Sequence, residues 1–211
     1  MNTLTILKKF TLAVIIMAGL GVASYAQTPN SSVSVLVTAT QTGNVSFSPE
    51  TFGMSVQIKH RMSNMFMLDN TTDGAIARTG WDSGHSVSNT SLLRAYAGDK
   101  HTAFFVGGGM KFGRESVAKV SNTTVNPAIT AGLDFSLAKV QVEPYGLFLA
   151  NDLNGSSKSR SLGAGLQFVI PATDSVGVKF QVSGSRTSAL VGSTPTREFK
   201  NVYGAGIGLQ F

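Results

Sequence analysis

Apolar side chains occupy every second position through much of this chain, and glycine, serine, threonine and glutamine fill most positions between them. From Ile129 to Leu137 the odd positions are Ile, Ala, Leu, Phe and Leu, while the even positions are Thr, Gly, Asp and Ser. The segment from Leu162 to Ile170 repeats this alternation. Successive side chains of a strand point to opposite faces, so a period of two predicts strands between two different environments. No convincing period of 3.6 residues is found, and the predicted fold class is therefore all-β.

The connections between these predicted strands alternate in length. Short turns are expected near 61–64, 98–100, 138–139 and 171–174. Longer polar loops, rich in Asn, Ser, Thr and Gly, are expected near 43–51, 71–87, 114–125, 152–158 and 188–198. Strands joined by short connections pair with their neighbours as hairpins. The pattern favours ten strands joined up and down, or eight if 63–70 is a loop or 33–42 an extension.

The polar faces favour a membrane barrel over a soluble one. They carry glycine and small polar residues rather than the Lys and Glu of a surface in water. Glycine allows strands to curve and pack closely in a narrow barrel. Short turns that alternate with longer loops are typical of outer-membrane barrels, and a closed barrel leaves no strand edge unpaired. We therefore predict an up-and-down antiparallel transmembrane β-barrel with a polar lumen. A soluble lipocalin-like barrel would give the same alternation and is the alternative.

The N-terminal segment has the form of a secretory signal. Lys8 and Lys9 precede the apolar run of residues 10–22, and small residues follow at Ser24 and Ala26. The run is too short to span a bilayer comfortably, since a transmembrane helix needs about 20 residues. We expect a signal peptide at 1–26 and the barrel at 27–211. The chain has no cysteine, and its formal charge of +6 is not gathered into a basic cluster, so nucleic acid is not an expected partner.

The end of the chain resembles a known family. "YGAGIGLQF" is similar to the C-terminal strand of Gram-negative outer-membrane proteins, which end on an aromatic residue with apolar residues at alternate positions before it. The matching residues are Tyr203, Ile207, Leu209 and Phe211. The whole mature chain resembles the small opacity-protein and OmpX-like barrels. The resemblance implies a location in the cell outer membrane. It also implies that outer-membrane lipid and the assembly machinery are partners, and that an extracellular ligand is met through the loops.

The strand periodicity also predicts which polar side chains line the lumen. Opposite charges occur among them, and in a narrow barrel they would pair and fill the interior, since an unpaired buried charge is costly. A gate or a narrow ion path is the alternative interpretation. The predicted lumen network consists of Arg94, Lys111, Asp134, Glu143, Gln167, Lys179 and Gln181.

No catalytic, cofactor or metal site is expected. The glycine-rich stretches near 107 and 204 lack the helix that a dinucleotide fingerprint requires, and no two histidines have the spacing of metal ligands. Trp81 lies in a polar segment, where it either packs the loop or contacts a partner. We expect a structural or surface-interaction role without enzymatic activity. The alternatives are a narrow small-solute channel and a rim hydrolase that uses His85.

Overall fold

The computed structural model describes residues 31–43, 50–79, 84–99, 101–117, 120–153, 159–190 and 197–211. The predicted signal peptide at 1–26 and Trp81 lie outside these described residues. No helix within the described ranges is long and apolar enough to cross a membrane.

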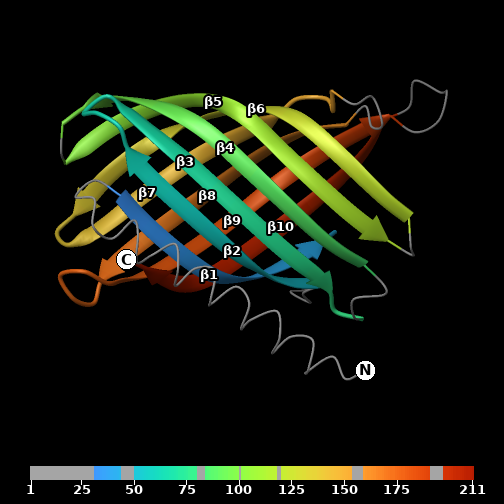
Figure 1. Cartoon of the computed structure of the whole chain (residues 1–211), viewed down its shortest axis with the longest axis horizontal. Coiled ribbons are helices and arrows are strands. Elements are labelled where there is room, and N and C mark those ends of the chain that lie inside the picture. The colour runs from blue at the N-terminus through green and yellow to red at the C-terminus, as the bar shows by residue number, and fades with distance from the viewer. Residues whose placement is uncertain are drawn as a thin grey trace.

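Ten strands make up the described chain. In order they are β1 (Ser31–Thr42), β2 (Thr51–Arg61), β3 (Phe66–Ala77), β4 (Gly84–Gly98), β5 (Thr102–Val117), β6 (Val120–Leu137), β7 (Val140–Leu149), β8 (Ser159–Pro171), β9 (Gly177–Leu190) and β10 (Arg197–Gln210). Each strand pairs antiparallel with the next, and β10 pairs with β1 to close the barrel (Figure 1). The predicted ten-stranded up-and-down barrel is confirmed, and the eight-stranded alternative is wrong.

Two of the predicted long loops are largely strand. The segment 71–87 contains the end of β3 and the start of β4, and the segment 114–125 contains the end of β5 and the start of β6, with only 118–119 between them. Both segments are rich in hydroxyl and amide side chains, which the sequence analysis interpreted as loop composition. In the barrel these polar side chains belong to strands that continue in antiparallel register to Val117 and Val120. The prediction from composition was wrong here because strands in a barrel wall can carry polar side chains and still have their backbones paired.

The barrel is apolar outside and polar inside. Outward positions keep large apolar side chains exposed, for example Ile129 at 60% and Leu162 at 65%. Inward positions bury charged side chains, with Asp69 and Lys179 each only 1% exposed. A water-soluble barrel has the opposite distribution, so these faces are those of a transmembrane barrel with a polar lumen.

The apolar exterior is interrupted on β3 and β4 by a polar patch of Asn70, Thr72, Asn89 and Ser91. The amide of Asn70 donates to Ser91 Oγ at 2.7 Å. The amide of Asn89 donates to Asn70 Oδ1 at 2.8 Å and to Thr72 Oγ1 at 2.9 Å. Lipid offers no hydrogen-bond partner, and the patch lowers the cost of its exposure by satisfying its polar groups internally.

The last strand, β10, closes the barrel, and the apolar face that the sequence predicts for it points outward. Tyr203, Ile207 and Leu209 are exposed on its outer side, and Phe211 follows them in the same alternation. Phe211 and Val33 exchange two backbone hydrogen bonds, of 2.8 and 3.0 Å. On the inner side, a Cβ at Gly208 would lie 1.8 Å from the carbonyl oxygen of Val35. The junction between β1 and β10 therefore needs glycine at this position.

Candidate functional site

Arg94 of β4 is the centre of a group of charged side chains that crosses the lumen. Its guanidinium donates to Glu143 Oε1 of β7 at 2.7 Å and forms a second ion pair with Asp69 of β3. Arg94 is 3% exposed, and the two carboxylates are buried as well. One cation held between two anions reduces the cost of desolvation that each charge would incur alone.

Further contacts extend this group of side chains on both sides of Arg94. Lys59 of β2 forms an ion pair with Glu143. Gln57 of β2 donates to both oxygens of Asp69 at 3.0 and 3.1 Å, and its own carbonyl oxygen accepts from Lys179 of β9. We call these six side chains the lumen network: Gln57, Lys59, Asp69, Arg94, Glu143 and Lys179.

An apolar layer packs against the lumen network. Phe105 of β5 is fully buried, and the guanidinium carbon of Arg94 lies 4.5 Å from the centre of its ring. Met67 and Tyr96 pack with Phe105, and the two ring centres are 5.4 Å apart. Arg61 covers the other side of this layer, with its guanidinium 5.4 Å from the Tyr96 ring centre. Polar and apolar side chains together fill the lumen at this level.

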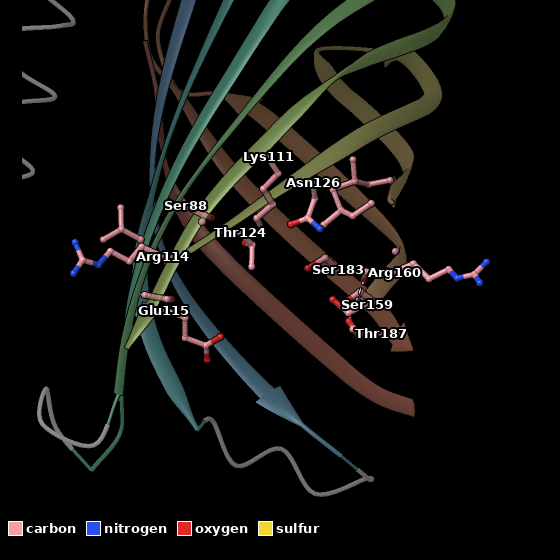
Figure 2. A pocket seen from close by; sticks show the side chains of 18 of the residues that line it. Ser88, Lys111, Arg114, Glu115, Thr124, Asn126, Ser159, Arg160, Ser183 and Thr187 are labelled. Carbon is pink, nitrogen blue, oxygen red and sulfur yellow. Dashed lines mark hydrogen bonds between the residues drawn. The ribbon is translucent and has the colours of Figure 1, made fainter. Parts of the chain in front are cut away.

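A cavity of about 620 Å³ occupies the end of the lumen opposite to Phe211 and the start of β1; we call it the vestibule. Hydroxyl and amide side chains of several strands line it (Figure 2). Lys111, Tyr145 and Leu147 also line a smaller cavity of about 170 Å³ that reaches Asp69 and Arg94. The vestibule thus leads down to the lumen network.

A second opening lies at the end of the short turns. A cavity of about 450 Å³ is lined by Arg61, Tyr96, Asp99 and Asp134, among others. A smaller one of about 80 Å³ reaches Lys59 and Glu143 from the same side. The lumen network and its apolar layer therefore separate cavities that approach from opposite ends.

The structure places the predicted lumen residues at three levels. Arg94, Glu143 and Lys179 lie in the lumen network. Gln167 is buried beside it, and the amide of Gln181 donates to the Tyr145 hydroxyl at 3.1 Å. Lys111 lines the vestibule, and Asp134 lies near the short turns, where it accepts from the amide of Gln141 at 3.0 Å.

Three members of the lumen network were not predicted from the sequence: Gln57, Lys59 and Asp69. Gln57 and Lys59 alternate with the apolar positions Val56 and Ile58, so strand parity alone would have identified them. Asp69 was harder to find because Met67, two residues before it, also points inward and hides the alternation.

Chemically, this arrangement can hold a barrel closed. Arg94 binds both carboxylates and Lys59 binds Glu143, and the members of the network come from β2, β3, β4, β7 and β9, so opposite walls are joined through the centre. Within the described residues, no group of three or more His, Asp or Glu side chains has an arrangement that could hold a metal ion. His85 lies on β4 in the outward alternation of Val87, away from the vestibule.

No family model and no curated protein matches the chain. Solved structures similar to it include the outer membrane protease OmpT from Escherichia coli, with a TM-score of 0.48 and 7% identity over 88% of this chain and 97% of that one. Neisserial surface protein A gives 0.44 and 9% over 85% and 95%, and the NanC porin gives 0.42 and 7% over 83% and 98%. With TM-scores below 0.5 these similarities carry no argument, and the barrel is established by the chain's own strand pairing.

Proposed function

We propose that this protein is an outer-membrane β-barrel with a closed lumen, which acts as a structural or surface-interaction protein and not as a channel. The observation that carries the proposal is the lumen network, because Lys59, Arg94 and Lys179 and their partners occupy the centre of the barrel. A conducting pore needs a continuous water-filled path, as in the wide porins. Here charged side chains that bind one another take that space.

The outer end of the barrel supports a surface role. Strands β5 and β6 run to Val117 and Val120, and polar side chains continue to the open vestibule (Figure 2). An extracellular ligand would meet this end first. The residues that contact the ligand would come from the segments 71–87, 114–125 and 188–198. Trp81, in the first of these segments, is the candidate contact residue.

We propose that the protein is not an enzyme. The rim hydrolase considered from the sequence would need His85 to face the lumen, whereas His85 alternates with residues of the outward face. Asp82, Ser83 and Ser86 lie near His85 in the sequence; the first two are outside the described residues, and Ser86 of β4 lines the vestibule.

Fractionation of cells tests the proposed location. The protein is expected in the outer-membrane fraction, and its gel migration should change on heating because a closed barrel keeps its hydrogen bonds in detergent until it is heated. Recovery from the periplasm without detergent would contradict the proposal.

The proposed partnership with the assembly machinery has its own test. Deletion of Phe211 should lower the amount that reaches the outer membrane in cells more than it lowers refolding into detergent. Phe211 contributes two backbone hydrogen bonds and a partly exposed ring, so its loss costs the folded barrel little. An equal loss in both assays would mean that the residue is simply structural.

A further inference from the structure

Two arginines lie side by side on the outer surface of the barrel, at the end that holds the vestibule. Arg186 of β9 pairs in register with Leu162 of β8, and Arg160 lies two residues further along β8. Diagonal neighbours on a sheet are about 7–8 Å apart, within reach of long side chains. Figure 2 shows Arg160 pointing away from the vestibule. The two guanidinium groups can therefore reach one common ligand outside the barrel.

Their height along the barrel matches the edge of the hydrocarbon layer. Ten residues separate Arg160 from Ile170, at the other end of the outward apolar row of β8. At about 3.3 Å per residue and a tilt near 40°, this distance spans about 25 Å along the barrel axis, the height of the apolar band of such barrels. On β5 the same separation joins Phe104 to Arg114, which also points outward (Figure 2). These arginines thus lie where lipid headgroups begin.

No counter-ion for the pair is found among the side chains that the structure describes: no carboxylate there forms an ion pair with Arg160 or Arg186. Arg186 lies over the ring of Phe199, at 4.2 Å from the ring centre, and that ring is 58% exposed. Two neighbouring like charges repel each other, and an anion between them would remove that repulsion.

We propose that Arg160 and Arg186, with Phe199 beneath them, bind the phosphate group of a lipid in the outer leaflet; this inference rests on the proposed outer-membrane location. Guanidinium groups bind phosphate oxygens in a bidentate manner, so two of them can hold one phosphate with several charge-assisted hydrogen bonds. The exposed ring of Phe199 and the apolar positions Leu162 and Tyr203 provide the surface for the acyl chains of the same lipid. Headgroup and chains would then bind to one continuous surface of β8, β9 and β10.

The test uses the protein refolded into phosphatidylcholine nanodiscs that contain either diphosphoryl lipid A or the same lipid after removal of its phosphates. Native mass spectrometry counts the lipid A molecules that remain bound. The wild-type protein should retain the phosphorylated lipid, and so should the control Lys139→Gln, which removes a cation from a turn at the opposite end. The Arg160→Gln/Arg186→Gln variant should bind it at least about tenfold more weakly, the factor expected for a lost charge-assisted hydrogen bond.

Equal retention of phosphorylated lipid A by the double variant and the wild type would overturn the inference, and so would equal retention of the dephosphorylated lipid. If inorganic phosphate at the same concentration as the lipid releases the bound lipid A, the arginine pair is a site for free phosphate. That result would also overturn the inference. The location has a separate readout. A wild-type protein that does not enter the bilayer contradicts the proposed function, whereas insertion with lipid binding independent of the arginines contradicts only this inference.

Discussion

Glu143 is the residue on which the closure of the lumen depends most, because it faces two cations. Its carboxylate binds both Lys59 and Arg94, and its side chain is 3% exposed. Glu143→Gln removes the charge and leaves the cations without this partner. Loss of one partner from a buried ion pair costs about 3–5 kcal/mol of unfolding free energy.

The measurement for this variant is urea-induced unfolding in lipid vesicles. Glu115→Gln is the control, because Glu115 is an exposed carboxylate that lines the vestibule, and surface substitutions usually change stability by less than about 0.5 kcal/mol. Equal unfolding midpoints for the two variants would show that Glu143 is not part of a stabilising network.

Gly208 is required by the approach of two backbones. A Cβ there would meet the Val35 carbonyl oxygen at 1.8 Å, and this atom cannot move without separating β1 from β10. Gly208→Ala should therefore lower the stability of the barrel by about 1–3 kcal/mol, the usual cost of overpacking. Gly108→Ala is the matched control, since its nearest atom would be 3.9 Å away. Thermal unfolding of the two variants compares them, and equal midpoints would contradict the steric account.

At the scale of single residues, the sequence was a good guide where alternation was clean and a poor one where it was not. The parity of Arg94 and Glu143 could be assigned from their apolar neighbours, but no pattern in the sequence says that these two residues, 49 positions apart, meet across the lumen. That contact depends on closure of the barrel. For Asp69 even the parity was hard to assign. Met67, two residues before it, also points inward, where it belongs to the apolar layer.

At the scale of the strands, β3 and β4 are the exception to the apolar exterior. The amides of Asn70 and Asn89 satisfy each other there, with Thr72 and Ser91 as further partners. Asn89→Leu should lower the unfolding free energy by about 1–3 kcal/mol, because it leaves the side-chain oxygen of Asn70 without its donor on the lipid side. Asn70→Leu/Asn89→Leu should recover most of this loss, since it removes both polar groups.

Urea unfolding of both variants in vesicles provides the comparison. A double variant that is no more stable than Asn89→Leu would mean that the patch stabilises the barrel through contacts of its own, and the account of mutual satisfaction would be wrong.

The strand predictions failed where polar composition and strand geometry disagree. The segments 71–87 and 114–125 contain few large apolar residues, and such composition normally marks loops. In this barrel they continue β3 to β6, because the pairing that starts in the apolar band extends through polar residues such as Thr123 and Ser116. The turns near 138–139 and 171–174 could be predicted because abrupt breaks in alternation mark them. Ala138 there adopts a positive φ of 55°.

At the scale of the whole molecule, the barrel is an apolar wall around a filled centre. The order of the strands follows from their sequence, since each pairs with the next and β10 returns to β1. The filling of the lumen does not follow from local pattern. It arises because ten tilted strands bring side chains of β2, β3, β4, β7 and β9 to one level, where Lys59 and Arg94 bind carboxylates and Lys179 donates to Gln57.

Electrical recording in planar lipid bilayers tests the closed lumen most directly. The wild-type barrel should insert without current steps above the baseline. The Arg94→Ala/Phe105→Ala variant should conduct, because it removes the centre of the lumen network and the buried ring beneath it. Insertion of both is checked by heat-modifiable migration of the protein recovered from the vesicles. Discrete current steps from the wild-type barrel, at a frequency that rises with the amount of inserted protein, would show an open path through the lumen and contradict the account.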